Sequence, residues 1–233
     1  MGLQPGYLDY ILECVTSELG ELAGKRMLEL GDQTIGADDI PETTGKEYYE
    51  NRGVQHTSFD LNSKHGSLPV DLSQPIQDPQ WRGAFDIITN SGTSEHVEPL
   101  DSQYDCFMNI HDCLKVGGIS IHLVPDFDEL EQRGYWENHC NNYYTHKFFN
   151  LLAELNGYTL VSSKVINGLR CVCLRKTSHA AFTESREELL AEIGRRTGGV
   201  VYSGINTHPL LSPFVSLYRQ LVIATRRLCR GSN

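Results

Sequence analysis

No apolar run in this 233-residue sequence reaches the roughly 18 to 20 residues that a membrane-spanning helix requires. The segment after Met1 has no basic stretch followed by a long apolar core, so we expect no secretion signal. The seven cysteines form no C-x-x-C pair, and their odd number and wide scatter argue against a disulfide framework or a zinc knuckle. These absences predict a soluble, cytoplasmic protein whose thiols are reduced and mostly buried.

Charge is distributed unevenly along the chain. The formal net charge is −10, and the residues from Lys176 onward are basic, so residues 1–175 are more acidic than the total suggests. A strongly acidic body repels a phosphate backbone. We therefore expect a small-molecule partner and no nucleic-acid substrate.

Helix-like and strand-like segments alternate along most of the sequence. This alternation predicts an α/β protein with a doubly wound, mostly parallel sheet of seven strands. Asn167-Gly168 joins the last two strand-like runs and is typical of a tight turn, so the sheet should close with an antiparallel hairpin. We expect helices over 5–23, 47–52, 104–116 and 143–155, and strands over 26–30, 54–61, 67–72, 84–90, 119–124, 158–166 and 169–174.

We divide the chain into a domain over residues 1–176 and a helical C-terminal extension over 177–233. From Pro213 the extension projects as an amphipathic helix with a basic face. The simplest interpretation is a helix packed on the domain's own surface. The alternatives are contact with a second copy, an acidic partner or an anionic membrane surface. Residues 177–212 would then form a lid or a connector.

Small and acidic residues follow several of the expected strands. In open α/β sheets, ligands bind beyond the carboxyl ends of the strands. A carboxylate after the second strand can accept both hydroxyls of a ribose, and a glycine lets the backbone approach a ligand closely. The residues in question are Glu29, Gly31 and Asp32 after the first strand, Asp60 and Leu61 after the second, Asp71 and Leu72 in the third, and Asn90 and Ser91 after the fourth.

Five segments in this order resemble successive motifs of class I S-adenosylmethionine-dependent methyltransferases, which have a Rossmann-like fold. The resemblance covers roughly residues 5–176, and the terminal hairpin matches the family's reversed last strand. The segments are Met27-Leu-Glu-Leu-Gly31, Ser58-Phe-Asp60-Leu-Asn, Asp71-Leu72, Phe85-Asp-Ile-Ile-Thr-Asn-Ser-Gly-Thr-Ser-Glu-His-Val97 and Leu114-Lys-Val-Gly-Gly-Ile119.

The resemblance implies S-adenosylmethionine as the cofactor and assigns a role to each position. Glu29 and the turn at Gly31 and Asp32 would hold the methionine part of the cofactor. Asp60, with Leu61 beside it, would bind the ribose hydroxyls. Asp71 and the Leu72 backbone would contact the adenine edge, and Asn90 and Ser91 would line the wall near the sulfonium and the acceptor.

The sequence departs from the family pattern at two places. The second glycine of the family's turn is replaced by Gln33, and the next glycine is Gly36. Only residues 61–66 separate Asp60 from Ser67, which is fewer than the roughly dozen residues that a helical crossover requires. We therefore expect that the second helix is missing or that the third strand is vestigial.

Methyl transfer from a sulfonium needs mainly alignment and exclusion of water, with a base where the acceptor must lose a proton. His96 is the first candidate base because it follows the fourth strand; alternatively, Glu95-His96-Val97 begins a helix and positions the loop. His139 and His146 are weaker candidates. Some methyltransferases bind magnesium through Glu-x-x-Glu-His, but Gly92 occupies the first Glu position here, so no metal is expected.

The leading hypothesis is a methyltransferase that acts on an oxygen, nitrogen or carbon atom of a small molecule. The main alternative is a non-catalytic methyltransferase-like binding module that acts through partners. A nicotinamide-dependent oxidoreductase fits less well, because residues 31–36 do not match G-x-G-x-x-G. An Asn/Asp-Pro-Pro-Tyr/Phe motif, expected of enzymes that methylate exocyclic amines of DNA, is also absent.

Overall fold

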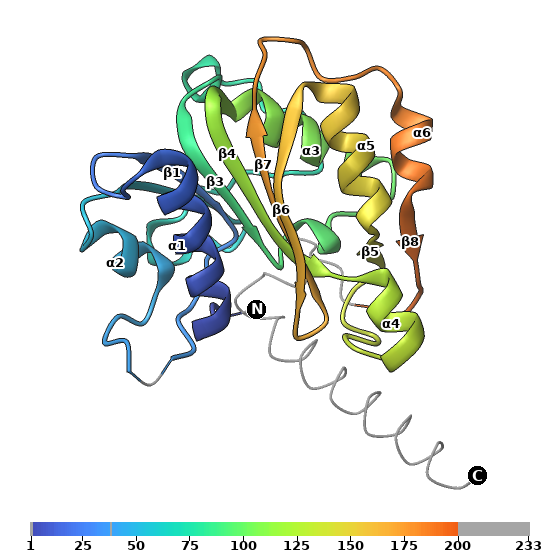
Figure 1. The fold of residues 1–233 in the computed structure, drawn as a ribbon, viewed down its shortest axis with the longest axis horizontal. Helices are drawn as coiled ribbons and strands as arrows, with labels where there is room; N and C mark the ends of the chain where they lie inside the picture. Colours follow the sequence, from blue (N-terminus) through green and yellow to red (C-terminus); the bar gives the residue numbers. More distant parts are fainter. Residues whose placement is uncertain (1, 38, 200–233) are drawn as a thin grey trace, which may run out of the picture.

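A computed structural model describes residues 2–37 and 39–199 (Figure 1). Its centre is a six-stranded sheet in the order β2-β1-β3-β4-β7-β6. The strands β2, β1, β3 and β4 run parallel, and β7 and β6 are antiparallel to their neighbours. The strands are β1 (Arg26–Leu30), β2 (Gln55–Phe59), β3 (Phe85–Ser91), β4 (Leu114–Pro125), β6 (Tyr158–Ile166) and β7 (Leu169–Lys176).

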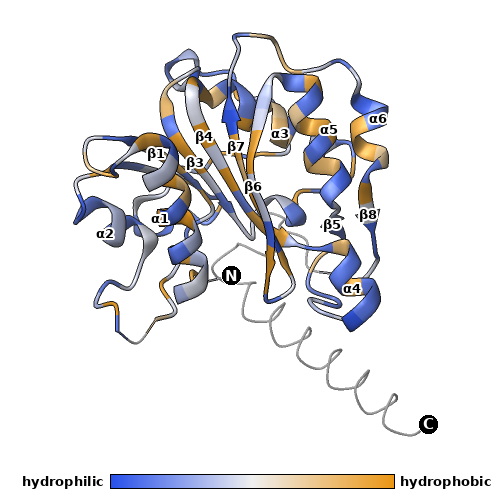
Figure 2. Cartoon of the chain, in the orientation of Figure 1, coloured by the Kyte–Doolittle hydropathy of each residue, from blue (hydrophilic) through white to orange (hydrophobic). Residues whose placement is uncertain are grey.

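Helices cover both faces of this sheet, as the alternating pattern predicted (Figure 1). Successive residues of a strand point to opposite faces, so Met27 packs in one apolar cluster and Leu28 in the other. Apolar residues, orange in Figure 2, run along the central strands, whereas α4 is mostly blue. One face carries α1 (Pro5–Leu19) and α2 (Gly45–Glu50); the other carries α3 (Ser102–Cys113), α5 (His146–Asn156) and α6 (Arg186–Ala191).

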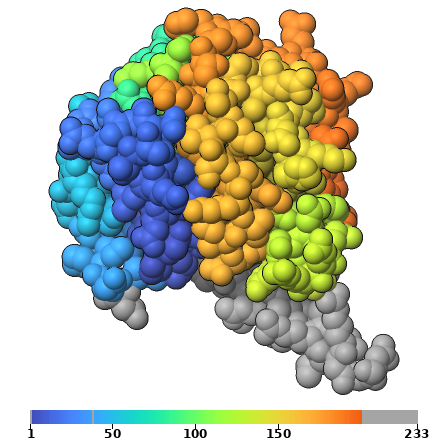
Figure 3. Space-filling view, in the orientation of Figure 1, coloured from blue at the N-terminus to red at the C-terminus, as the bar shows by residue number. Residues whose placement is uncertain are grey.

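The closing hairpin is confirmed. Asn167 and Gly168 connect β6 to β7 with φ values of 49° and 76°. Both values lie in the left-handed region that this type of two-residue turn requires. In Figure 3, the outer strand β6 lies beside α1 on the visible face, and the two elements are in contact.

The seventh strand, expected over residues 67–72, is reduced to one isolated parallel bridge between Phe59 and Leu68. Leu68 N donates to Ser58 O at 2.8 Å, and Asp60 N donates to Leu68 O at 3.0 Å. Between β2 and this bridge lies the short 3-10 helix η1 (Lys64–Gly66). The expectation of seven strands is therefore wrong for the described residues, because the connection is too short for a helical crossover.

Six shorter elements were not expected from the sequence. They are α4 (Phe127–Arg133), α6, β5 (Asn142–Tyr144), β8 (Ile193–Arg195) and the 3-10 helices η1 and η2 (Pro79–Trp81). Tyr143 and Tyr144, expected to begin a helix, belong to β5, and α5 begins at His146. The strands β5 and β8 pair antiparallel in a separate two-stranded sheet. Leu189, Leu190 and Ile193 belong to the main core, so the described start of the predicted C-terminal extension packs into the domain.

The amphipathic helix predicted from Pro213, with its partner contact, lies outside the described residues. Among the described helices, none has the length and apolar character needed to cross a bilayer. The six described cysteines are buried and form no disulfide, as expected. Cys171 and Cys173 lie in the same apolar cluster as Cys14 of α1, so they share one face of β7.

His122 lies in β4, is 1% exposed, and is held as a neutral imidazole. Asn90 Nδ2 lies 3.2 Å from its Nδ1, and Ser120 Oγ lies 3.2 Å from its Nε2. Burial lowers the pKa of His122 from 6.5 to about 3. The folded imidazole therefore stays neutral at a pH where the unfolded chain binds a proton.

Stability should consequently fall as the pH drops below the unfolded pKa of His122. When the pH is lowered from about 7 to about 5, this group should reduce the free energy of unfolding by about 2 kcal/mol. Urea unfolding at both pH values should show this loss in the wild type and in His146→Gln, an exposed control, but a smaller loss in His122→Asn. An equal loss in His122→Asn would contradict the assignment.

Candidate functional site

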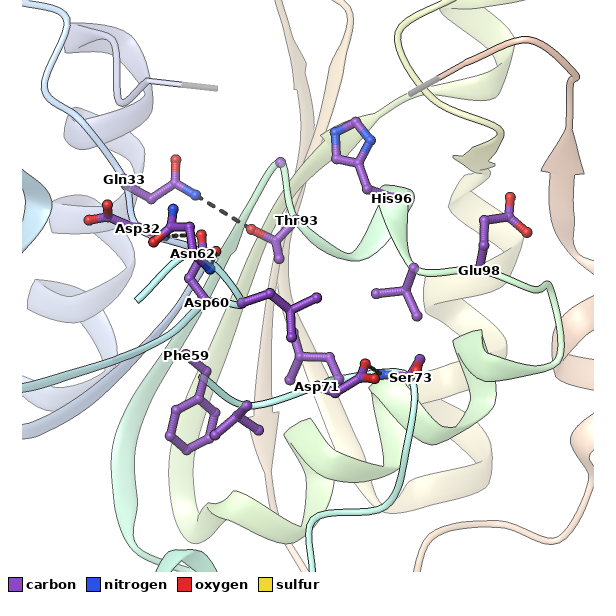
Figure 4. A pocket seen from close by; sticks show the side chains of 16 residues that line it. Asp32, Gln33, Phe59, Asp60, Asn62, Asp71, Ser73, Thr93, His96 and Glu98 are labelled. Carbon is purple, nitrogen blue, oxygen red and sulfur yellow. Dashed lines mark hydrogen bonds between the residues drawn. The ribbon is translucent and has the colours of Figure 1, made fainter. Parts of the chain in front are cut away.

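A cavity of about 270 Å³ opens beyond the carboxyl ends of β1, β2 and β3 (Figure 4). This is the place where parallel α/β sheets bind ligands, because the loops diverge there and leave backbone groups exposed. The residues that line it are Gly31, Asp32, Gln33, Phe59, Asp60, Leu61, Asn62, Val70, Asp71, Leu72, Ser73, Gly92, Thr93, His96, Val97 and Glu98.

Gly31 makes the turn that follows β1. Its φ is +83°, and its N–H donates to Phe59 O at 2.8 Å. A Cβ at this position would lie 2.4 Å from Thr93 Oγ1 and 2.7 Å from Gln33 Nε2. The turn therefore requires glycine both for its backbone conformation and for its space.

Gln33 occupies the position of the family's second glycine and lines the cavity. Its side-chain Nε2 donates to Leu30 O at 3.3 Å and lies 3.5 Å from Thr93 Oγ1, the dashed contact in Figure 4. Its Oε1 is buried and accepts no hydrogen bond from any residue in the described ranges. The wall of the cavity thus contains a buried amide with an unused acceptor where the family has bare backbone.

Asp60, at the end of β2, ties two loops of the cavity together. Its Oδ2 accepts from Asp32 N and its Oδ1 accepts from Asn62 N, both at 2.8 Å. The carboxylate of Asp32 in turn lies 2.7 Å from His65 Nδ1. Asp60 keeps free lone pairs, because each carboxylate oxygen can accept two hydrogen bonds.

Asp71 and Leu72 lie along the part of the cavity formed by the vestigial third strand. Asp71 is exposed, and its Oδ1 accepts from Ser73 N at 2.9 Å. Leu72 is buried, and its carbonyl accepts from Asn109 Nδ2 at 3.3 Å. Leu61 is 37% exposed and lies at the mouth of the cavity.

Three residues assigned to the site from the sequence do not line the cavity. Glu29 lies beneath the turn, 2% exposed, with Oε2 3.4 Å from His56 Nε2, and burial raises its pKa. Asn90 is fully buried; its Oδ1 accepts from Ser94 N and its Nδ2 donates to Ser94 Oγ. Ser91 is 5% exposed, and the neighbouring Gly92 and Thr93 line the cavity instead.

His96 lines the cavity at the end of the 3-10 helix η3 (Ser94–His96), so its loop does begin a short helix. Its imidazole is 1% exposed and lies apart from Asp60 and Asp71 in Figure 4. Glu95 Oε1 lies 3.7 Å from His96 Nε2 and 3.6 Å from His139 Nε2. Burial acts to raise the pKa of Glu95, but the nearby imidazoles outweigh it and the net direction is downward.

The sequence did not predict this cluster. It named His96 and His139 as separate candidates and took Gly92 as evidence against a metal. The structure brings Glu95, His96 and His139 together although His139 follows more than forty residues later. No spacing rule could have found the pairing, because the loop before β5 decides where His139 lies.

No protein-family model matches the sequence, and no curated protein matches it. Solved structures do match. N-methyltransferase NodS from Bradyrhizobium japonicum WM9, in complex with S-adenosylhomocysteine, is 13% identical with a TM-score of 0.52, over 75% of this chain and 89% of that chain. A S-adenosylmethionine-dependent methyltransferase from Clostridium acetobutylicum is 13% identical with a TM-score of 0.51, over 73% and 90%.

A third match is 1,6-didemethyltoxoflavin-N1-methyltransferase from Burkholderia thailandensis, with bound 1,6-didemethyltoxoflavin and S-adenosylhomocysteine. It is 17% identical with a TM-score of 0.50, over 71% of this chain and 76% of that chain. At these identities the likeness establishes the fold. The chain has the Rossmann-like fold of class I S-adenosylmethionine-dependent methyltransferases.

Proposed function

We propose that this chain binds S-adenosylmethionine in the cavity and transfers its methyl group to a small-molecule acceptor. The observation that carries the proposal is the position of Asp60. Its carboxylate lies at the end of β2, lines the cavity, and stands next to the positive-φ turn at Gly31. A nucleoside ligand needs this pairing of a ribose acceptor with a close backbone approach.

The cavity residues fit the cofactor part by part. The methionine part would lie against Gly31, where a Cβ would take up the space. The buried Oε1 of Gln33 would accept a hydrogen bond from the cofactor's amino group, which would satisfy an acceptor unused by the described residues. Asp60 would accept the ribose hydroxyls, and the adenine would lie along Asp71 and Leu72.

The bound cofactor supplies an activated methyl group on a positively charged sulfur. The chain's own contribution would be to hold the acceptor in line and to exclude water. His96 is the imidazole that lines the cavity, and it would accept a proton from an acceptor that must lose one. The carboxylate of Glu95, 3.7 Å from the imidazole, would stabilise the resulting positive charge.

A small acceptor is supported by charge and by the compared structures. Residues 1–175 are acidic, which disfavours a polyanionic acceptor. Two of the similar structures are described as N-methyltransferases, and one of these holds the small molecule 1,6-didemethyltoxoflavin.

A non-catalytic binding module is the second candidate. Gln33 in place of the family's glycine and the shortened 61–66 segment both alter the cofactor side of the cavity. Such a module either binds the cofactor without transferring its methyl group or has lost the cofactor and acts through partners. Methyl transfer to any member of a broad panel of small acceptors would exclude it.

Calorimetric titration of the full chain with S-adenosylmethionine, S-adenosylhomocysteine and NAD tests the proposal directly. We expect dissociation constants of about 1–100 μM for the first two ligands, which corresponds to about 5–8 kcal/mol, and no heat with NAD. The dinucleotide's pyrophosphate would meet the Gln33 side chain where it needs bare backbone. Absence of binding to both sulfur ligands would refute the methyltransferase and a cofactor-binding module, and it would leave a module that has lost the cofactor.

A further inference from the structure

Behind the cavity wall, three side chains converge on one point. Glu95, His96 and His139 each offer one ligand atom, and these atoms lie within 4.8 Å of one another. Glu95 is fully buried, His96 is 1% exposed, and the His139 side chain is 24% exposed. The two imidazole rings are 4.8 Å apart and nearly perpendicular, at 70°.

The backbone that carries Glu95 and His96 is held rigidly. Ser94 N donates to Asn90 Oδ1 at 3.1 Å, and Tyr144 Oη donates to Ser94 Oγ at 2.9 Å. Asn142 Nδ2 donates to Glu95 O at 3.0 Å. The partners of these bonds lie in β3 and β5, so the two sheets hold Glu95 and His96 in place.

His139 is positioned by a strained loop. Trp136 has a φ of 60°, in a region that bulky residues rarely adopt, and Asn138 has a φ of 61°, which asparagine tolerates better. The conformation is held from both sides, because Trp136 Nε1 donates to Asn167 O at 3.0 Å and Tyr143 Oη donates to Trp136 O at 2.7 Å. The Trp136 ring also packs against the His139 ring at 5.1 Å. The loop directs His139 toward Glu95.

The carboxylate of Glu95 lacks ordinary hydrogen-bonding partners. Neither of its oxygens accepts a hydrogen bond within the described ranges, although both are buried. The imidazoles face it at 3.6 and 3.7 Å, which is longer than a hydrogen bond. A buried carboxylate without hydrogen bonds is costly unless a cation completes the site.

We propose that Glu95, His96 and His139 bind a divalent transition-metal ion. Two imidazoles and one carboxylate with open positions suit zinc, iron, cobalt or nickel better than magnesium or calcium. Metal–ligand bonds of about 2.1 Å place tetrahedral ligand atoms about 3.4 Å apart. Two of the observed separations, 3.6 and 3.7 Å, are close to that value, so modest side-chain shifts would close the site.

The ion would lie next to the cavity, because His96 belongs to both. Any effect of the ion on methyl transfer rests on the proposed function, whereas metal binding itself does not. An imidazole that holds a metal cannot accept a proton, so His96 would not act as the base while the ion is bound, and the acceptor's proton would pass to solvent water. A bound ion lowers the pKa of a hydroxyl that coordinates to it, and it would therefore favour acceptors with an oxygen donor.

The test is titration of the dialysed full chain with Co²⁺, followed by visible absorption and checked by elemental analysis for bound metal. We expect one equivalent bound by the wild type and at least about tenfold weaker binding in Glu95→Gln and His139→Gln, since even outer-shell changes cost this much. His146→Gln removes an exposed imidazole outside the cluster and should bind as the wild type does. Zn²⁺ should displace Co²⁺ from the site.

His139→Gln keeps the test decisive if Glu95→Gln fails to fold, because His139 is partly exposed. Circular dichroism of each variant checks the fold. Metal binding that is equal in His139→Gln and the wild type would overturn the proposal, as would no binding of Co²⁺ or Zn²⁺. Calorimetry with S-adenosylhomocysteine on the metal-free chain separates the two proposals, since His139 does not line the cavity and its replacement should leave that binding unchanged.

Discussion

Asp60→Asn is expected to weaken S-adenosylhomocysteine binding about a hundredfold, because hydrogen bonds to a charged acceptor contribute about 1.5–3 kcal/mol and each 1.4 kcal/mol is tenfold. An amide keeps the shape of the carboxylate and one acceptor oxygen. It cannot accept two ribose hydroxyls while it also holds Asp32 N and Asn62 N. Calorimetric titration of the variant measures the loss.

Asp86→Asn is the matched control for this change. Asp86 also accepts a hydrogen bond from a backbone N–H, that of Arg26 at 2.8 Å, and it pairs with Lys115. It lies at the amino end of β3, whereas the cavity opens beyond the carboxyl end. The control should lose some stability and retain wild-type affinity for S-adenosylhomocysteine. Equal affinity of Asp60→Asn and the wild type would show that Asp60 does not bind the ribose.

Gly31→Ala is expected to reduce S-adenosylhomocysteine binding by at least about thirtyfold and stability by about 2–4 kcal/mol. The new Cβ would collide with Thr93 Oγ1 and Gln33 Nε2 and push both side chains into the cavity. Alanine also adopts a φ of +83° at a cost that glycine does not have. Calorimetry and urea unfolding measure the two effects separately.

Gly20→Ala separates backbone strain from the blocked cavity. Gly20 has nearly the same φ, +82°, and a Cβ there would meet nothing within 4 Å. The control should cost about 1 kcal/mol of stability through the backbone alone, with no change in ligand binding. If Gly31→Ala bound the ligand as Gly20→Ala does, the turn at Gly31 would not contact the cofactor.

The sequence predicted the main elements because each carries its own local pattern. The strands β1 and β3 are short buried apolar runs, α3 and α5 have helical periodicity, and α5 ends before Gly157 as expected. The helix expected over 104–116 ends instead at Cys113, because Leu114 pairs with Phe85 and begins β4. Positive φ at Asn167 and Gly168 follows from the residue types themselves. The length of the 61–66 segment likewise predicted that either the second helix is missing or the third strand is vestigial.

Contacts between distant segments were not predictable in this way. The strands β5 and β8 are three residues each and form only because they meet across the domain. Glu29, Asn90 and Ser91 follow or end strands, as ligand-binding residues do, yet they point into the protein and not into the cavity. Strand position predicts which edge of the sheet a residue approaches, whereas packing decides which way its side chain faces.

By itself, the sequence determined a doubly wound sheet, its closing hairpin and the carboxylate at Asp60. Periodicity and turn chemistry are local properties, and parallel strands bring their carboxyl ends to one edge wherever they form. The sequence left open whether the second helix is missing or the third strand vestigial, and the tertiary structure shows one isolated bridge with only the short η1 before it. The tertiary structure alone decided the convergence of Glu95, His96 and His139. Such contacts depend on how loops from distant parts of the chain pack together, and a local sequence pattern does not specify the distance between those parts.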